Sequence, residues 1–360
     1  MFSVRPIKSF REAAYAAVAS AALLASGYAY RGQPTEPAQT PDGSTTDRFP
    51  IEKIQKGVVY VYDDIPARKK GFDGTGFAIQ PDVPTGPDNY IVTACHLVSE
   101  RGQKVYVQLP NGKAMPASVI GCDKKIDTAV LKIPQSSLAP LEWGDLKAVR
   151  QGDPVYSYGN PAGIRNTLTK GIVSALRHCV DCYLGAIQSD VTTNHGNSGG
   201  PFFNANGQVL GLVSFFIWHN TGLNFMVNTP VIRKAADDMI LYGRVNEGVV
   251  GVTITDSVIK QFNIDQLDNH NGALVISVSA GSAAELAGIK KGDVITRFND
   301  SAVTDEGDFA YYAYLTPPGD PCRLTIMRGG RSMNLGLVMG ELPSPVHKKK
   351  VAKGLHRHHS

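Results

Sequence analysis

The pattern of apolar and polar positions predicts a mainly β chain. Between residues 51 and 243, short apolar runs rich in β-branched residues alternate with turn residues such as those of 110–112 and 204–207. Many short strands with this punctuation indicate β-barrels or sandwiches. The predicted strands cover residues 58–62, 76–79, 90–92, 105–109, 117–120, 128–133, 153–158, 168–176, 186–188, 208–216 and 224–227.

Helical spacing follows these strands. Residues 231, 232, 235, 236, 239 and 240 are apolar, which is typical of a helix with one buried face, and we expect a domain-closing helix over 231–242. A second domain is expected over 247–340. Its predicted strands are 249–254, 273–278, 294–298 and 322–327, and its predicted helices are 282–287 and 304–315.

The first 30 residues predict export. Arg5, Lys8 and Arg11 precede an uncharged, alanine-rich run over 13–30. This order is typical of a secretory signal peptide, and the length of the run also suits a retained membrane anchor. Either reading places the rest of the chain in the periplasm or cell envelope. Residues 31–50 are polar and rich in proline, so we expect a flexible linker there.

Composition and charge exclude several classes of function. The 360 residues suggest two domains or slightly more. With 42% hydrophobic and 19% charged residues, the chain can bury a sizeable core. The formal net charge is +4, but the excess cations lie in the first twelve residues and in a basic, histidine-rich tail over 341–360. We expect that tail to be disordered, and no nucleic-acid-binding face is predicted on the folded domains.

The cysteine spacing predicts no metal site. Zinc requires four ligands, and His178 with Cys179 and Cys182 offers at most three. In an oxidising compartment a local disulfide between Cys179 and Cys182 is the expected outcome. The other cysteines, Cys95, Cys122 and Cys322, are expected to behave as small buried apolar residues. No cofactor is predicted.

A glycine-rich stretch over 188–201 provides a candidate nucleophile. Ser198 lies within GNSGG, where glycine permits sharp turns and close approach of a substrate. The backbone amides of Gly196, Asn197 and Ser198 are placed to bind the oxyanion that forms when a serine attacks a carbonyl. A structural serine in a tight hairpin turn is the alternative, because a serine hydroxyl needs a base before it can act as a nucleophile.

The candidate base and its partner lie upstream. His96 ends an apolar run, and histidine suits proton transfer near neutral pH. Asp127 opens an apolar strand, where a carboxylate needs a partner if it is buried. The order His96, Asp127, Ser198 is the chain order of chymotrypsin-type enzymes.

Seven stretches occur in one order along the chain: GTGF at 74–77, TACH at 93–96, DTAVLKI at 127–133, GNPAG at 159–163, GIVSA at 171–175, GNSGGP at 196–201 and GLNFMV at 222–227. Together they resemble the HtrA/Deg family of trypsin-like serine proteases with PDZ domains, from about residue 57 to about residue 338. Cys95 and His195 depart from the family's usual residues at their positions.

The resemblance implies a fold and roles for individual residues. It implies a two-barrel chymotrypsin-like serine protease domain over 51–243, with the site between the barrels, and a PDZ domain over 247–340. His96 would be the general base and acid, Asp127 its orienting partner and Ser198 the nucleophile. Gly196 and Ser198 would supply the oxyanion hole. A homotrimer is also implied.

The resemblance further implies two binding regions. Thr192, Asn224 and Met226 would form the S1 pocket, and the uncharged Thr192 favours small or medium aliphatic P1 residues. The carboxylate-binding loop and first strand of the PDZ groove would consist of Val249, Val250, Gly251 and Val252. This groove would bind C-terminal peptides by strand addition, while a small packing domain without a ligand is the alternative.

The function expected from these features is that of a serine endopeptidase of the periplasm or cell envelope that cleaves unfolded or misfolded proteins. Two alternatives remain open. One is a membrane-anchored stress sensor that cuts a specific regulator after its PDZ domain binds exposed C-termini. The other is a PDZ-based chaperone or binding protein with a silent site.

Overall fold

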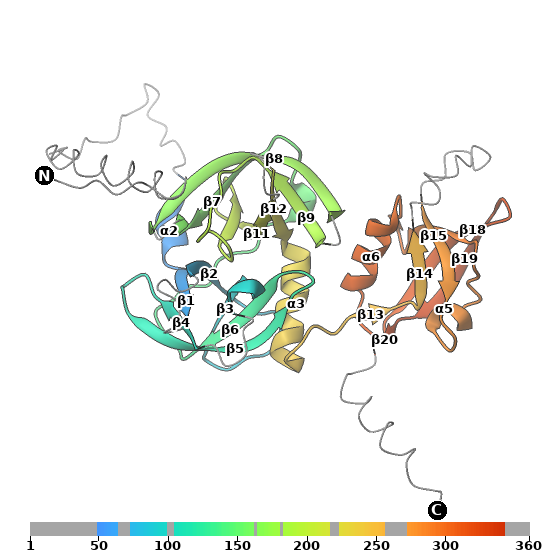
Figure 1. The fold of residues 1–360 in the computed structure, drawn as a ribbon, viewed down its shortest axis with the longest axis horizontal. Coiled ribbons are helices and arrows are strands. Elements are labelled where there is room, and N and C mark those ends of the chain that lie inside the picture. The colour runs from blue at the N-terminus through green and yellow to red at the C-terminus, as the bar shows by residue number, and fades with distance from the viewer. Residues whose placement is uncertain are drawn as a thin grey trace, which may run out of the picture. The chain divides into compact units, whose positions relative to one another are not determined.

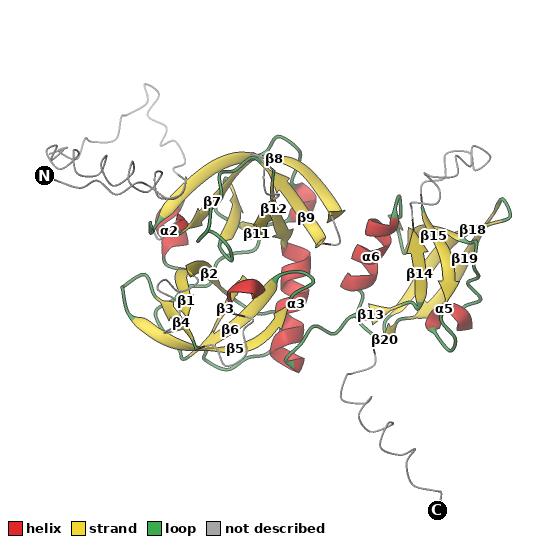
Figure 2. Cartoon of the chain, viewed as in Figure 1, coloured by secondary structure: helices red, strands yellow, loops and turns green. Residues whose placement is uncertain are grey.

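The structure is a computed structural model, and it describes residues 49–63, 73–98, 104–161, 164–180, 183–216, 223–255 and 272–342. Strands dominate this part of the chain, as Figure 2 shows, and the mainly β prediction is confirmed. The predicted signal peptide or anchor, the linker up to residue 48 and the tail from residue 343 lie outside the described residues. Within the described ranges, no helix combines the length and the apolar character needed to span a membrane.

The first barrel consists of six antiparallel strands that close in the order β1-β2-β3-β6-β5-β4. Alternate residues point inward, so that Val59 and Val61 on the first strand are both buried. The strands are β1 (Val58–Asp63), β2 (Asp73–Ile79), β3 (Asn89–Ala94), β4 (Val105–Gln108), β5 (Ala114–Asp123) and β6 (Thr128–Ile133).

The second barrel closes in the order β10-β11-β12-β9-β8-β7, which is the strand order of the first barrel repeated. Its interior holds fully buried apolar residues such as Val155, Ile187 and Phe202. The strands are β7 (Pro154–Gly159), β8 (Thr167–Val180), β9 (Tyr183–Ser189), β10 (Pro201–Asn204), β11 (Val209–Phe216) and β12 (Asn224–Asn228). Two six-stranded barrels in series confirm the predicted chymotrypsin-like architecture.

The long helix α3 (Thr229–Tyr242) contacts β5 and β6 of the first barrel and β11 and β12 of the second (Figure 1). Asn228 caps its N-terminus by accepting the Val231 N–H, and Gly243 ends it in the left-handed conformation. The predicted helix over 231–242 is confirmed. Shorter helices are α2 (Ile51–Gln55) and the 3₁₀ turns η1 (Cys95–Leu97) and η2 (Leu146–Ala148).

A smaller sheet follows, with β14-β15-β16-β18-β19 in sequence across it and β17 beside β16. Its core includes Val275, Ile295, Phe298, Leu324 and Ile326. The elements are β13 (Gly248–Val249), β14 (Val252–Thr255), β15 (Ala273–Val278), α5 (Ala283–Leu286), β16 (Val294–Phe298), β17 (Ser301–Ala302), α6 (Glu306–Leu315), β18 (Pro321–Arg328), β19 (Arg331–Val338) and β20 (Gly340–Glu341).

The structure corrects the expected edges of the linker and tail. Phe49, placed in the flexible linker by composition, stacks on Tyr156 with a ring separation of 4.2 Å and meets Phe203 edge-on. Glu341, placed in the disordered tail, pairs with Gly248 in the β13–β20 ladder. In both places a short segment gains partners that lie far away in the sequence.

Candidate active site

His96 lies at the end of β3, where the strand passes into the 3₁₀ turn η1. Ala94, Cys95 and Leu97 on either side are buried, and they anchor the turn in the first barrel. The His96 side chain itself is 45% exposed. The apolar run therefore presents this imidazole at the barrel surface.

Asp127 lies in the turn between β5 and β6 and faces His96. Its Oδ1 accepts the backbone N–H of His96 at 2.9 Å, and its Oδ2 lies 2.8 Å from His96 Nδ1. Because a carboxylate only accepts hydrogen bonds, this contact favours the tautomer that carries the proton on Nδ1 and leaves Nε2 as an acceptor. The φ angle of Asp127 is +48°, a conformation that costs a non-glycine residue about 1–3 kcal/mol and that its surroundings must hold.

A third polar group, Ser214, completes this network from the second barrel. Its Oγ donates to Asp127 Oδ2 at 2.7 Å, and the residue is 5% exposed. Ser214 lies at a register shift in the β11–β12 ladder, and a bulge of this kind re-aims a side chain. Ser214 is not among the residues predicted from the sequence, although a serine within the apolar run 209–216 was an available signal.

Ser198 lies in the turn between β9 and β10, packed against the first barrel. Its carbonyl accepts the Thr75 N–H at 2.9 Å. A Cβ on the neighbouring Gly199 would lie 2.2 Å from the Thr75 carbonyl oxygen and 2.7 Å from the Ala94 nitrogen. The backbone of the serine turn therefore lies directly against Ala94, the last residue of β3, which precedes His96 by two residues in the sequence.

The proposed oxyanion turn differs in one respect from the sequence prediction. The Asn197 N–H donates to the Asn194 carbonyl at 3.0 Å, so this amide is used inside the turn and is removed from the predicted oxyanion hole. Gly196, with φ of +99°, has its carbonyl held by the Thr75 hydroxyl at 2.7 Å. The predicted oxyanion hole is therefore reduced to the backbone amides of Gly196 and Ser198.

The three residues predicted to form the S1 pocket differ in their exposure and contacts in the structure. Asn224 is nearly buried, its amide donates to the Val191 carbonyl, and its Oδ1 accepts the Thr193 hydroxyl at 2.8 Å. Thr192 is exposed. Met226 is fully buried in the core of the second barrel, so its assignment to an S1 wall is corrected, because the side chain points into packed apolar residues.

The predicted peptide-binding loop of the smaller domain lies directly before β14, the first strand of its main sheet. The Val250 carbonyl accepts the Ala284 N–H, and Gly251 has φ of +87° with no space for a side chain, since an added Cβ would lie 2.2 Å from Ser282 Cβ. Val249 pairs with Gly340 in the β13–β20 ladder. Val252 opens β14, which is the edge strand of its sheet among the described residues.

The cysteine predictions are partly wrong. Cys95 and Cys122 form a disulfide across 27 residues, instead of being separate apolar residues. Cys322 is buried, which raises the pKa of its thiol to about 11, and the prediction for it is confirmed. Cys182 lies outside the described residues, and so does the predicted pair that it would form with Cys179.

A contact between β8 and α6 was not predicted. His178 Nδ1 lies 2.6 Å from Asp308 Oδ1, and the His178 ring stacks on Tyr311 at 4.4 Å. Burial acts to raise the pKa of Asp308, but hydrogen bonds from Thr304 and His178 outweigh it and lower the pKa below its ordinary value. The barrel and the smaller sheet thus share a polar contact.

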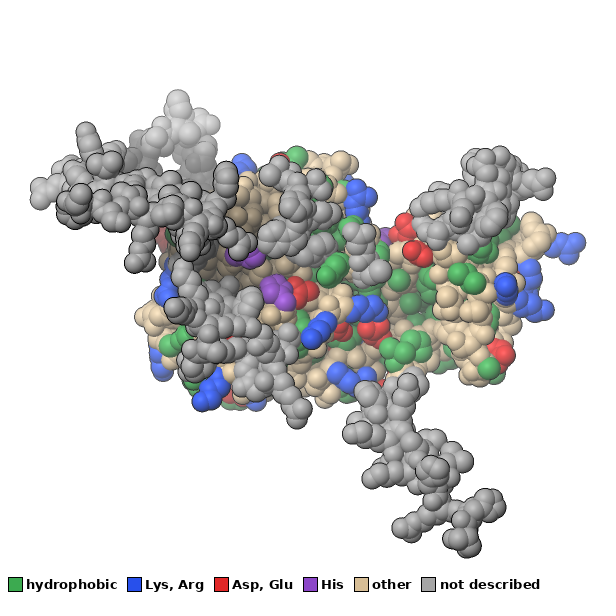
Figure 3. Space-filling view, viewed as in Figure 1, with side chains coloured by type: hydrophobic (Ala, Val, Ile, Leu, Met, Phe, Trp, Pro, Cys, Tyr) green, Lys and Arg blue, Asp and Glu red, His purple; other side chains and the backbone are tan. Residues whose placement is uncertain are grey.

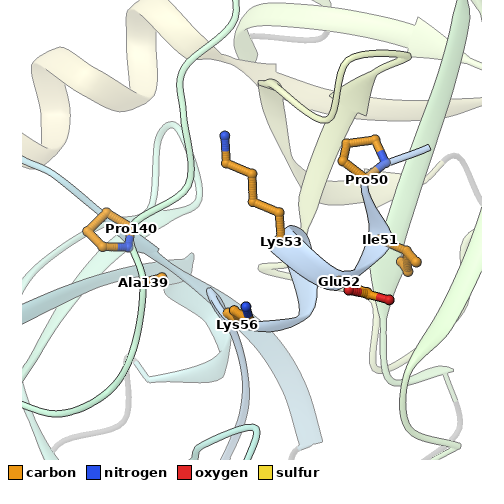
Figure 4. A pocket seen from close by; sticks show the side chains of 7 residues that line it. All are labelled: Pro50, Ile51, Glu52, Lys53, Lys56, Ala139 and Pro140. Atoms are coloured by element: carbon orange, nitrogen blue, oxygen red, sulfur yellow. The ribbon is translucent and has the colours of Figure 1, made fainter. Parts of the chain in front are cut away.

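A separate pocket of about 420 Å³ lies beside α2, lined by the residues labelled in Figure 4. Lys53, one of its lining residues, pairs with Glu142 at 2.7 Å. None of the predicted site residues lines this pocket, so it is not part of the candidate site. On the face shown in Figure 3, basic and acidic side chains are interspersed over the described surface.

The double barrel, with histidine and aspartate from one barrel and serine from the other, defines the class of chymotrypsin-like serine proteases. Two family models match the chain: a trypsin-like peptidase domain over residues 74–212 and a PDZ domain over residues 251–337.

Curated relatives agree with these matches. A probable periplasmic serine endoprotease, DegP-like, of Rhizobium meliloti (strain 1021) is 35% identical over 290 residues, which cover 78% of this chain and 56% of the relative. One of the same description from Pseudomonas putida (strain W619) is 30% identical, covering 83% and 67%. The chain spans 56% and 57% of the length of the first two relatives that it matches.

Solved structures give the same result. The HtrA-type protease AlgW with a tripeptide superposes with a TM-score of 0.66 at 26% identity, covering 82% of this chain and 97% of that one. The serine endoprotease from Yersinia pestis superposes with a TM-score of 0.59 at 26% identity, covering 81% and 96%. The chain belongs to the family of DegP-like, HtrA-type serine endoproteases.

Proposed function

We propose that this chain is a serine endopeptidase that cleaves unfolded or misfolded proteins in the periplasm or cell envelope. The observation that carries the proposal is the Asp127 carboxylate, which binds both the backbone N–H and the Nδ1 of His96 while the Ser198 turn packs against the same strand end. The relatives are named periplasmic serine endoproteases, which supports both the reaction and the compartment.

In the proposed reaction His96 Nε2 takes the proton from Ser198 Oγ as the oxygen attacks the scissile carbonyl. Asp127 keeps the imidazole in the required tautomer and stabilises the imidazolium that forms. The amides of Gly196 and Ser198 bind the developing oxyanion. His96 then gives the proton to the leaving amine, and water repeats the cycle to release the acyl group from Ser198.

Peptide binding by the PDZ domain is the second part of the proposal. The domains are assigned to 51–243 for proteolysis and 247–340 for C-terminal peptides. An incoming C-terminus would add to the edge strand β14, with its carboxylate near Val250 and Gly251. A homotrimer and, if the apolar run is retained, membrane attachment through residues 13–30 are also parts of this proposal.

An aliphatic P1 preference is also proposed, because neither Thr192 nor Asn224 offers a negative charge to a basic side chain. Profiling the cleavage sites in an unfolded protein such as reduced, carboxymethylated lactalbumin checks this. Small or medium aliphatic residues should precede the cleaved bonds, and a predominance of lysine or arginine would contradict the assignment.

Labelling with a fluorophosphonate tests the reaction. The full chain should become covalently labelled and should degrade an unfolded protein, whereas the Ser198→Ala variant should do neither while unfolding at the same temperature. Labelling that persists in the variant, or an intact protein that neither labels nor cleaves under any condition, would overturn the proposal and favour a silent binding protein.

The polar contact between β8 and α6 favours a sensor as the second candidate function, since it joins the barrel that carries Ser198 to the domain that would bind C-termini. Labelling in the presence of C-terminal peptides separates the two. Constant labelling indicates constitutive quality control, and labelling only with peptide indicates a sensor protease.

A further inference from the structure

We propose that the Cys95–Cys122 disulfide positions the His96–Asp127 pair, so that cleavage depends on the oxidation state of these two cysteines. This inference rests on the proposed function, because it concerns the residues assigned to proton transfer. Cys95 directly precedes His96, and Cys122 lies five residues before Asp127. The disulfide therefore connects the segments that carry the two groups.

The bridge spans three neighbouring strands of the first barrel. Cys122 on β5 pairs with Ala129 on β6, and Ala129 pairs with Thr93 on β3. Cys95 lies just beyond the end of β3, so the disulfide crosses over the start of β6. Asp127 lies at that start, directly before Thr128, and is therefore enclosed by the crossing.

A second link closes the ring around this turn. The Cys95 N–H donates to the Asp127 carbonyl at 3.1 Å. Cys95 thus holds the segment from Cys122 to Asp127 at both ends, by a covalent bond at one end and a hydrogen bond at the other. The adjacent His96 N–H then reaches Asp127 Oδ1.

This double attachment explains how Asp127 keeps its left-handed conformation. A non-glycine residue at φ of +48° persists only where its surroundings over-determine it. Loss of the covalent link leaves the turn to its hydrogen bonds and to the buried Ile126, and the distance between Asp127 Oδ2 and His96 Nδ1 becomes less well fixed. A misplacement of about 1 Å in such a pair can lower the rate about 100-fold.

The fold itself has other supports. Ile126, inside the same turn, is fully buried in the main apolar cluster, and β5 and β6 remain paired on both sides of the bridge. Removing the disulfide is therefore expected to disturb the position of the pair more than the barrel.

The chemistry of the switch is thiol–disulfide exchange with a dithiol. Cys122 is half-buried, whereas Cys95 is fully buried, so the attacking thiolate would reach Cys122 Sγ. The sulfur of the reductant bonds to Cys122 Sγ as the disulfide breaks, and Cys95 Sγ leaves as a thiolate and takes up a proton. The second thiol of the reductant then displaces Cys122, which yields two protein thiols and one oxidised dithiol.

The test compares the oxidised full chain, the same protein reduced with dithiothreitol, and the double variant Cys95→Ala, Cys122→Ala. The readouts are kcat and KM on a fluorogenic peptide, the rate of fluorophosphonate labelling, and thermal unfolding. We expect reduction and the double variant each to lower kcat and the labelling rate about 10–100-fold, with KM changed less than about 2-fold, at a temperature where both proteins are folded.

Matched controls separate the bridge from other thiols. Cys322→Ala should keep the activity of the parent and its full response to reductant, because Cys322 is buried in the smaller domain. The double variant should not respond to reductant, and reoxidation of the parent should restore kcat. If the double variant does not fold, reduction and reoxidation of the parent decide the question alone.

Equal kcat for the oxidised and reduced chains would overturn the inference, as would a loss of activity that only tracks unfolding. Absence of labelling in the oxidised parent both with and without C-terminal peptides, indistinguishable from Ser198→Ala, would instead overturn the proposed function.

Discussion

The two barrels have the same strand order but hold their parts of the candidate site in different ways. In the first barrel, His96 and Asp127 are fixed by side-chain hydrogen bonds and by the disulfide beside them. In the second, Ser198 is fixed by backbone hydrogen bonds and by the close approach of glycines to the first barrel. The positions of His96 and Asp127 should therefore be sensitive to the removal of polar atoms that bind them, and the position of Ser198 to the addition of atoms to its turn.

Removing the proposed nucleophile is expected to have the largest effect. Ser198→Ala deletes one oxygen and should lower kcat by about 10⁴–10⁶-fold, since the other members of a triad act only through the nucleophile. Steady-state cleavage of an unfolded protein measures the loss. The hydrogen bonds that hold this turn among the described residues are made by backbone atoms. The unfolding temperature should therefore stay within about 2 °C, and a large drop would show that Ser198 is structural.

Adding one methyl group to the serine turn tests how closely this turn packs against the first barrel. Gly199→Ala places a Cβ 2.2 Å from the Thr75 oxygen at a φ of +81°, and we expect a loss of about 2–5 kcal/mol in stability together with most of the activity. Denaturant unfolding and fluorophosphonate labelling measure the two effects.

Gly112→Ala is the matched control for that variant. Gly112 has a similar φ of +85°, but no atom lies within 4 Å of the added Cβ. It should cost only about 1–2 kcal/mol, with normal cleavage. Equal effects of the two variants would mean that backbone strain, and not close approach, governs the serine turn.

Removing the hydroxyl of Ser214, which lies in the second barrel but binds Asp127, tests how the His96–Asp127 pair is held. Ser214→Ala takes away one hydrogen bond to the Asp127 carboxylate, and we expect kcat to fall about 10-fold and stability to fall by about 1–3 kcal/mol. Ser157→Ala is the control, because the Ser157 hydroxyl is buried in the same barrel without a hydrogen-bond partner among the described residues. Its removal should be neutral or slightly stabilising, and kcat should not change.

The smallest expected effect concerns the contact of the second barrel with the PDZ domain. Hydrogen bonds lower the pKa of Asp308, so the ionised carboxylate stabilises the fold above its ordinary pKa of about 3.8, and this contribution is lost as the pH falls through the lower folded value. Asp308→Asn should therefore cost about 1 kcal/mol at pH 7, and the difference from the parent should shrink below about pH 4. Unfolding curves across this range measure the difference, and a difference independent of pH would contradict the assignment.

Much of the architecture could be predicted because it depends on local pattern. The helix α3 follows from its 3.6-residue spacing, and most strands follow from apolar runs between turns. The strand β19 could not be predicted in this way, since six of its eight residues are exposed and give no buried face to recognise.

The candidate site was predictable only in part, for physical reasons. His96, Asp127 and Ser198 could be selected because each belongs to a distinctive local pattern: His96 ends an apolar run, Asp127 opens one, and Ser198 lies within GNSGG. The contribution of Ser214 depends on a bulge, and the loss of the Asn197 amide depends on a turn hydrogen bond. The Cys95–Cys122 pair depends on three strands being neighbours, and local sequence encodes none of these contacts.

The repeated barrel has a consequence for the order in which the enzyme is assembled. All strands of the first barrel lie before residue 134, whereas Ser198 and Ser214 both belong to the second. A chain that has folded only its N-terminal half holds an imidazole and a carboxylate with nothing to activate. Under the proposed function, cleavage must wait until nearly the whole double barrel has formed, so a half-folded chain has no proteolytic activity.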